Sequence, residues 1–209
     1  MDDRAQIMHR LEAHYKGAKP GLRYSNAFEL LMATMLSAQT TDRQVNAVTK
    51  TLFAECPDAQ SLLALGQTAL EDRIRSCGFY HTKAAHMLAT CRILLDTYGG
   101  KVPQTLEELS ALPGVGRKTA NVVLSNAFGI PAIAVDTHVF RVARRLGLAT
   151  AKNVLETEKQ LMAVIPKEKW SDAHHWLIWH GRQLCDARRP KCAQCFLGDI
   201  CPWEGKGLN

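Results

Sequence analysis

A lysine that follows a glycine turn is the first residue of this sequence with clear chemical potential. The stretch reads Leu112-Pro113-Gly114-Val115-Gly116-Arg117-Lys118 and is flanked by segments with helical spacing of apolar residues. Lys118 therefore falls in the first turn of a helix, where the helix dipole and the neighbouring Arg117 both disfavour positive charge. A lysine with a reachable neutral amine can attack an electrophilic carbon and form a Schiff base. The alternative is a lysine that binds phosphate as a cation.

The same turn is suited to phosphate binding. Gly114 and Gly116 can each take φ > 0 without a Cβ clash, so we expect a tight turn with an approachable backbone. The amides that begin the next helix lack partners within it, and the helix dipole is positive there, so a phosphate oxygen fits. A Walker A loop is excluded, because it has four residues between its glycines and a following Ser or Thr. An ordinary helix–helix turn with a glycine cap is the alternative.

Asp136 is a second candidate for chemistry. It stands in Val135-Asp136-Thr137-His138, immediately before a predicted helix, and is well placed to cap that helix. A capping carboxylate whose other oxygen faces a cleft can also orient a nucleophile or stabilise a developing cation. His138 is expected to pack or to contact phosphate, and we assign it no catalytic proton.

Four cysteines close to the C-terminus have the spacing C-x6-C-x2-C-x5-C. They are Cys185, Cys192, Cys195 and Cys201. In a reducing compartment, clustered thiolates indicate metal ligation rather than disulfides. Zinc and an iron–sulfur cluster both accept four thiolates. A single C-x2-C pair disfavours a zinc ribbon but leaves zinc open.

Three cations lie among these cysteines and form what we call the basic loop: Arg188, Arg189 and Lys191. A loop folded around a metal can present them rigidly to phosphates. The three remaining cysteines, Cys56, Cys77 and Cys91, have apolar neighbours and are expected in the core.

Composition and charge are consistent with a globular protein that binds a polyanion. The chain has 209 residues, 46% hydrophobic and 22% charged, with a net charge of +6. Residues 141–209 carry 12 basic and 7 acidic side chains, against 14 and 13 in residues 1–140. No apolar run reaches about 18 residues, and the N-terminus has no signal-like apolar segment. We therefore expect no membrane contact and a cytoplasmic, nucleoid-associated protein.

The elements that must position these residues read as helices throughout. No segment shows sustained alternation of apolar and polar residues, so we predict an all-α chain of about ten helices. Residues 26–38 are nearly all apolar and are expected to form a buried core helix. The remaining predicted helices cover residues 41–54, 58–65, 67–76, 82–98, 105–109, 117–128, 137–146, 153–165 and 171–184.

Taken together, these motifs resemble the endonuclease III family, bacterial DNA glycosylases with an associated lyase activity. The resemblance covers nearly the whole chain. The segments that carry it, besides the cysteine spacing, are Met35-Leu36-Ser37-Ala38-Gln39-Thr40-Thr41-Asp42, residues 112–124, residues 134–141 and His174-His175-Trp176-Leu177-Ile178.

This resemblance implies a two-lobed helix-hairpin-helix glycosylase fold. Residues 20–130 would form a six-helix barrel with the hairpin at about 107–128. Residues 1–19 and 131–209 would form a helical domain that holds one four-iron, four-sulfur cluster in the loop 185–201. The cluster is expected to serve DNA binding structurally. Double-stranded DNA with damaged bases or abasic sites is expected to lie across the groove between the lobes of a monomer.

The resemblance also implies the chemistry. Because a damaged base cannot be reached inside the stack, the nucleotide is flipped out. Gln39 matches the family's wedge residue, and Phe79 stands where the family inserts an apolar side chain. Lys118 would displace the base and form the Schiff base that leads to β-elimination, while Asp136 would position Lys118 and offset the cationic sugar. The expected substrates are oxidised or ring-saturated pyrimidines.

Two other functions share part of this pattern. A related glycosylase that excises adenine from mismatches would lack the motif lysine, carry a catalytic Glu near residues 35–39 and have a further C-terminal domain. This sequence has Lys118, no Glu in that region and only eight residues after Cys201. A non-catalytic DNA-binding metalloprotein would keep the hairpin and the cysteines but would need neither Lys118 nor Asp136.

Overall fold

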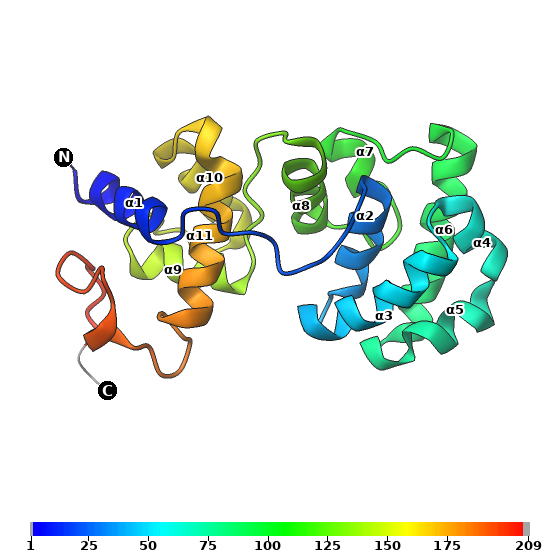
Figure 1. Ribbon diagram of the computed structural model, residues 1–209. Helices are drawn as coiled ribbons and strands as arrows, with labels where there is room; N and C mark the ends of the chain where they lie inside the picture. The colour runs from blue at the N-terminus through cyan, green and yellow to red at the C-terminus, as the bar shows by residue number, and fades with distance from the viewer. Residues whose placement is uncertain (1, 207–209) are drawn as a thin grey trace. The chain divides into compact units, whose positions relative to one another are not determined.

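The described part of the chain, residues 2–206 of a computed structural model, is built from helices alone (Figure 1). It contains eleven α-helices and three short 3₁₀ helices, and no strand within those residues. The all-α prediction is confirmed. None of the described helices is long and apolar enough to cross a membrane.

The helices divide into two compact units. The central unit runs from Pro20 to Ile130, and the terminal unit combines the residues up to Lys19 with those from Pro131 onward. The central unit contains α2 (Ala27–Leu36), α3 (Asp42–Glu55), α4 (Ala59–Leu65), α5 (Gln67–Ile74), η1 (Arg75–Cys77), α6 (Tyr80–Tyr98), α7 (Leu106–Ser110) and α8 (Arg117–Phe128).

Helix α2 forms the centre of the central unit. All but the first of its residues are buried, and it packs against α3, α6 and α8. A helix that is apolar all round must be enclosed, so the predicted core helix is confirmed. Asn26 caps its start by accepting from the Glu29 amide at 2.9 Å, and the helix ends at Leu36, two residues before the predicted end.

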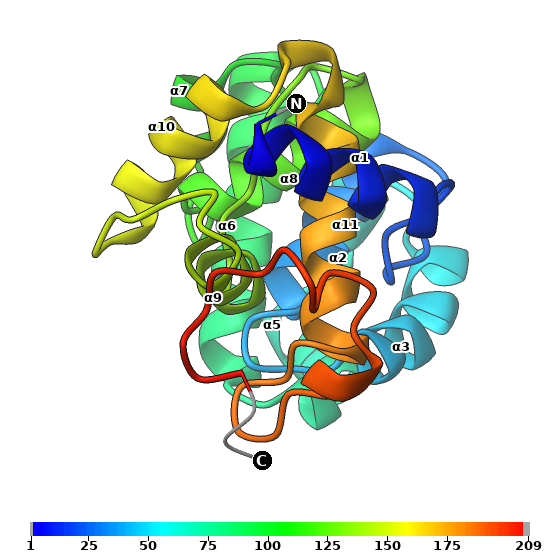
Figure 2. The same cartoon turned by 90° about the vertical axis from the view of Figure 1, so that its left-hand side faces the viewer.

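The terminal unit surrounds α11, as Figures 1 and 2 show. It contains α1 (Asp3–His14), α9 (Thr137–Arg145), α10 (Val154–Val164), η2 (Lys167–Lys169), α11 (Trp170–Gln183) and η3 (Cys192–Gln194). α11 packs against α9 and α1, and Ile7, Leu11, Val139, Val142 and Leu177 contribute to one buried cluster. The spacing of apolar residues did not predict α1, because only two of its side chains, Ile7 and Leu11, are buried in the core.

The three cysteines outside the cluster and two helix boundaries also had predicted positions. Cys56, Cys77 and Cys91 are buried, as predicted. α6 begins at Tyr80 rather than at residue 82, so the prediction was wrong by two residues at a position that proves important for the site. The segment predicted as one helix over 67–76 is α5 followed by the 3₁₀ helix η1, because the chain turns there toward Gly78 with φ +64°.

Candidate functional site

The turn between α7 and α8 requires glycine at one of its two glycine positions. Gly114 has φ +74°, and a Cβ there would lie 2.8 Å from the Nδ1 atom of His86. The Thr90 hydroxyl donates to the Pro113 carbonyl at 3.0 Å, which ties the turn to α6. Gly116 has φ −89° and open space around it. Of the two glycines that could take positive φ, only Gly114 does, and Gly116 serves as an extended N-cap of α8.

The hairpin presents its backbone and its charges rather than its apolar side chains. Leu112 and Val115 are 3% and 5% exposed, so their side chains anchor the turn in the core and only their main chain can reach a ligand. Arg117 and Lys118 are exposed in the first turn of α8. Gly116 has no side chain to cap the amides of that turn. The arrangement offers a helix N-terminus and a solvent-accessible amine on the same surface.

Gln39 and Phe79 share an unusual backbone conformation. They are the non-glycine residues with positive φ in the described chain, at +55° and +46°. Both are exposed, and Phe79, at 67%, is the most exposed large apolar side chain described. Both line one hollow of about 230 Å³, together with Met35, Ala38, Thr82, Lys83, His86 and Gly114. The structure thus brings together two residues that are 40 positions apart in the sequence.

Asp136 caps α9, as predicted. Its Oδ1 accepts from the Val139 amide at 2.8 Å. A carboxylate has acceptor sites on both oxygens, so this one bond leaves capacity for another partner. His138, half-buried in the first turn of α9, lies with Nδ1 3.1 Å from the Arg141 guanidinium. Asp136 belongs to the terminal unit and Lys118 to the central unit.

The four clustered cysteines line a single cavity of the terminal unit. No three His, Cys, Asp or Glu side chains among residues 2–206 converge closely enough to hold one metal ion, so the sulfurs are spread around this cavity. Burial raises the pKa of the Cys195 and Cys201 thiols. Thiolates at these positions therefore need compensating positive charge, which a bound metal centre supplies.

Donors around the cavity fit an anionic four-thiolate centre. The Arg145 guanidinium donates to Cys185 Sγ at 3.4 Å and to the carbonyls of Asp186 and Ala187 at 2.7 and 3.0 Å. The His180 Nε2 atom lies 3.8 Å from Cys195 Sγ. Such contacts orient ligands and tune a metal centre. Burial lowers the pKa of His180 to about 4, so its ring is neutral at physiological pH.

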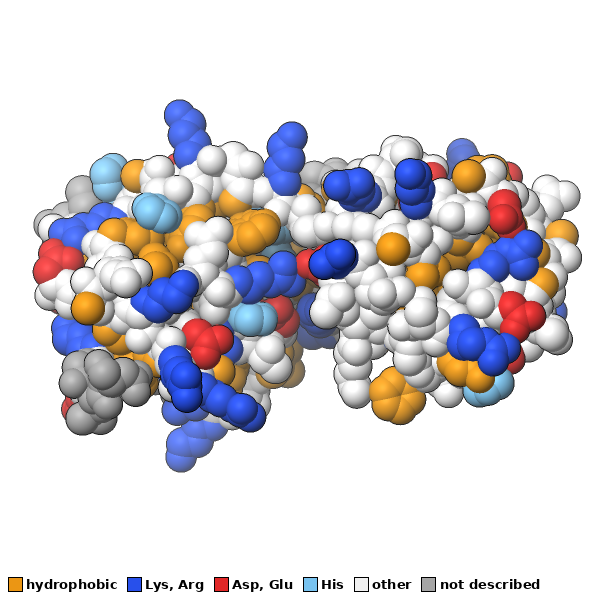
Figure 3. Space-filling view, turned by 60° about the horizontal axis from the view of Figure 1, so that its bottom comes forward, with side chains coloured by type: hydrophobic (Ala, Val, Ile, Leu, Met, Phe, Trp, Pro, Cys, Tyr) orange, Lys and Arg blue, Asp and Glu red, His pale blue; other side chains and the backbone are white. Residues whose placement is uncertain are grey.

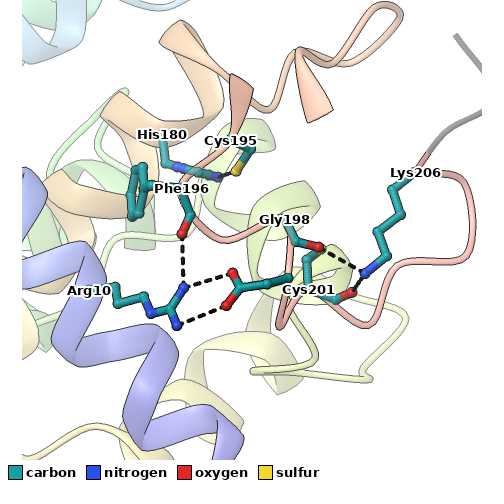
Figure 4. Close-up of polar contacts among 8 residues, drawn as sticks. Arg10, His180, Cys195, Phe196, Gly198, Cys201 and Lys206 are labelled. Carbon is teal, nitrogen blue, oxygen red and sulfur yellow. Dashed lines mark hydrogen bonds and ion pairs between the residues drawn. The ribbon is translucent and has the colours of Figure 1, made fainter. Parts of the chain in front are cut away.

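The second half of the loop that carries the cysteines is held by an ion pair and several hydrogen bonds (Figure 4). Arg10 of α1 forms a two-pronged ion pair with Asp199, at 2.7 and 2.9 Å, and also donates to the Phe196 carbonyl. Lys206 donates to the carbonyls of Gly198 and Cys201. The Arg10 contacts hold the segment after Cys195 to α1, and the Lys206 bonds tie the end of that segment back to its own start.

The basic loop is displayed at the surface. Its three cations are exposed, and the amides of Arg188 and Arg189 donate to Asp186 Oδ1 at 2.9 and 3.2 Å. Both hydrogen bonds lower the pKa of the Asp186 carboxyl below its usual range, and the bond from the Arg188 amide has the larger effect. On the face shown in Figure 3, Lys and Arg side chains predominate over acidic ones. A charged loop with a fixed backbone is suited to phosphate contacts.

Sequence reasoning assigned no role to Lys83, Arg141 or Arg145. The two arginines lie on α9, and Arg141 Nε donates to the Cys185 carbonyl at 3.1 Å, so both hold the first cysteine. Lys83 is 6% exposed and lies in the wall of the hollow beside Gln39 and Phe79. A signal existed for Lys83, because it shares the spacing of the buried Met87, Cys91 and Leu94 on α6.

Comparisons with known proteins agree with this geometry. Residues 32–167 match the family model of the HhH-GPD superfamily base excision DNA repair proteins, and residues 185–201 match the iron–sulfur binding domain of endonuclease III. Endonuclease III of Escherichia coli (strain K12) is 46% identical over 203 residues, which cover 97% of this chain and 96% of that protein. Endonuclease III of Bacillus subtilis (strain 168) is 52% identical over 181 residues, 86% of this chain and 83% of that protein.

A solved structure has the same fold as this chain. It is a trapped covalent intermediate of endonuclease III with DNA, in an estranged-adenine complex. The two structures agree with a TM-score of 0.93 at 46% identity, over 100% of both chains.

Proposed function

This chain belongs to the endonuclease III family of base-excision DNA glycosylases with lyase activity, and we propose that Lys118 is its nucleophile. The observation that carries the proposal is the exposed amine of Lys118 in the first turn of α8, directly after the turn fixed by Gly114. An exposed amine at that position can reach an electrophilic carbon of a substrate and form a Schiff base.

The reaction then proceeds in two stages. The Lys118 amine forms a bond to C1′ of the damaged nucleotide, and the C1′–N bond to the base breaks, with the electron pair leaving on the base, which is protonated. The C1′–O4′ bond then breaks and the sugar ring opens. O4′ keeps the electron pair of that bond and is protonated, and a double bond forms between C1′ and the lysine nitrogen, which is the protonated Schiff base. This cation acidifies C2′–H, and loss of that proton expels the 3′-phosphate and cleaves the strand. Water releases Lys118 by hydrolysis.

Asp136 is proposed to stabilise the cationic sugar and to orient the amine. A fixed carboxylate suits this role because it needs no reorganisation as positive charge develops. The cap bond to the Val139 amide fixes the Asp136 side chain before substrate arrives. The same bond occupies Oδ1, so Oδ2 is the oxygen we assign to the charge.

We further propose that Gln39 and Phe79 fill the space left by a flipped nucleotide. Two exposed side chains held at strained backbone positions around one hollow support this role. The substrate class we infer is duplex DNA with oxidised or ring-saturated pyrimidines, together with abasic sites. A monomer is expected to suffice, because the large apolar side chains exposed among the described residues are only Phe79, Val154 and Leu155.

The cavity lined by the four cysteines is proposed to hold a four-iron, four-sulfur cluster. The cluster supplies a rigid covalent framework for the loop between residues 185 and 201, which in turn displays the basic loop to DNA phosphates. The contacts of Arg145 and His180 support this assignment, because the guanidinium donates to Cys185 Sγ and the imidazole lies beside Cys195 Sγ. Visible absorbance of the purified protein, lost in Cys192→Ser, distinguishes the cluster from zinc.

Borohydride trapping tests the nucleophile. Incubation with thymine-glycol duplex DNA and sodium borohydride should give a covalent adduct whose modified peptide contains Lys118. Lys118→Gln should form none while still binding the duplex, and the matched control Lys101→Gln, at an exposed lysine of the same unit, should trap like wild type. Absence of an adduct with the wild-type protein would instead favour a non-catalytic DNA-binding metalloprotein.

A further inference from the structure

Two loops of the central unit carry the strained residues. Gln39 lies in the loop between α2 and α3, and Phe79 is the residue immediately before α6. Backbone conformations of this kind persist only where the surrounding structure enforces them. Something must therefore hold both loops at once.

Lys83 reaches both loops from the first turn of α6. Its Nζ atom lies 2.8 Å from the carbonyl oxygens of Leu36 and Ala38, and 2.7 Å from that of Cys77. An ammonium group has three N–H donors, and these three carbonyls match them. The hydroxyl of Thr40, at 3.0 Å, is a fourth oxygen around the charge and itself donates to the Cys77 carbonyl.

The partners of Lys83 adjoin the strained residues. Ala38 and Thr40 are the two neighbours of Gln39, and Cys77 is separated from Phe79 by a single glycine. The Leu36 carbonyl belongs to the last residue of α2, where carbonyls have no amide partner within the helix and the negative end of the helix dipole favours a cation. The Lys83 backbone amide also donates to the Phe79 carbonyl at 3.0 Å.

We propose that Lys83 is a positioning residue for base flipping, whose buried ammonium joins the two loops and keeps Gln39 and Phe79 displayed at the hollow. The inference rests on the proposed wedge role of those two residues. Lys83 is not a second nucleophile, because its side chain is buried and its three protons are matched by carbonyls. Burial lowers the pKa of Lys83, but its three carbonyl partners can only accept hydrogen bonds, which favours the protonated amine.

The test compares base flipping with chemistry in Lys83→Met. A 2-aminopurine opposite the lesion reports flipping, and single-turnover excision from lesion duplex reports the complete reaction. Strand cleavage of single-stranded abasic DNA reports the Lys118 chemistry without a duplex to open. Misplaced groups of this kind cost rates on the order of 100-fold, and we expect that loss in flipping and duplex excision. Cleavage of single-stranded abasic DNA should change by less than a tenth of that factor.

A merely structural role for Lys83 is tested by a matched control. Leu94→Ala removes a buried side chain from the same helix, eleven residues after Lys83 and so farther from both loops. It should lower the melting temperature as much as Lys83→Met while flipping normally. Lys83→Arg, which keeps the charge, should recover part of the flipping rate. Equal flipping defects in Leu94→Ala and Lys83→Met would overturn the proposal, and so would a Lys83→Met variant that flips like wild type.

A double-mutant cycle separates this proposal from the one on which it rests. In a Gln39→Ala/Phe79→Ala background, Lys83→Met should add no further flipping defect. A full additional defect there would refute action through these residues. If Gln39→Ala/Phe79→Ala itself flips like wild type, the wedge role is refuted along with the proposal. Should Lys83→Met fail to fold, Thr40→Val removes one partner of the ammonium and should give the same pattern at smaller size.

Discussion

Asp136 caps a helix, and a single substitution can separate this structural role from the electrostatic role that we propose for its charge. Its Oδ1 caps α9 by accepting from the Val139 amide at 2.8 Å. Asn caps a helix about as well as Asp, whereas Ala removes the cap at a cost of about 1 kcal/mol. We therefore expect Asp136→Asn to keep the free energy of unfolding within about 0.5 kcal/mol of wild type. Asp136→Ala should lower the melting temperature by about 2–4 °C for a chain of this size.

The loss of charge should appear in the rate in both variants. Removing one group that stabilises developing charge costs about 3 kcal/mol, or on the order of 100-fold in the rate of the chemical step. Single-turnover excision from thymine-glycol duplex should fall by that factor in Asp136→Asn and in Asp136→Ala alike. Thermal unfolding of the same samples gives the stability. The rate loss is thereby uncoupled from the stability loss.

A second aspartate provides the control. Asp58 caps α4 through the Ser61 amide at 2.8 Å, and Ser61 returns a bond to the Asp58 amide. Asp58→Asn keeps a cap and removes a charge, as Asp136→Asn does, and should excise at the wild-type rate. An Asp136→Asn variant that also excises at the wild-type rate would refute any part for the charge. A slow Asp136→Asn variant that is as unstable as Asp136→Ala would refute the separation of the two roles.

Three other predictions concern the hairpin, the basic loop and α11. Gly114→Ala, with φ +74° and a Cβ 2.8 Å from a ring nitrogen, should destabilise by more than about 1 kcal/mol in urea unfolding, whereas Gly116→Ala should fold normally and lose DNA affinity in fluorescence anisotropy. Neutralising the three cations of the basic loop should reduce the slope of log K against log salt by about 2.7, and an unchanged slope would exclude phosphate contacts there. Burial lowers the pKa of His175, so the unfolded chain gains a proton below about pH 6.5 that the folded chain refuses, and stability should decline on acidification below that pH. His175→Gln should flatten this decline in urea unfolding between pH 7 and 5.

The sequence predicts the helices and the cap of α9 because these depend on neighbours along the chain. Apolar spacing defines the core helix around Leu31, and an Asp before a helix is recognisable without a structure. The positive φ of Gln39 and Phe79 could not be predicted, since nothing in either local sequence requires it. The conformation is enforced from outside each loop, by a lysine 44 positions from one of them and 4 from the other. The residues around each loop therefore do not indicate that Lys83 is its partner.

The two lysines of the central unit illustrate why residue type alone does not assign a role. Lys83 faces the carbonyl end of α2, where three main-chain oxygens and the negative end of the helix dipole stabilise a buried ammonium. Lys118 lies at the amide end of α8, where the dipole has the opposite sign and the side chain is exposed. One lysine is therefore held as a fixed cation, which suits it to tie loops together. The other is exposed at the surface, so its amine can reach a substrate. The end of the helix that each lysine faces, rather than its side-chain type, therefore distinguishes the proposed positioning residue from the proposed nucleophile.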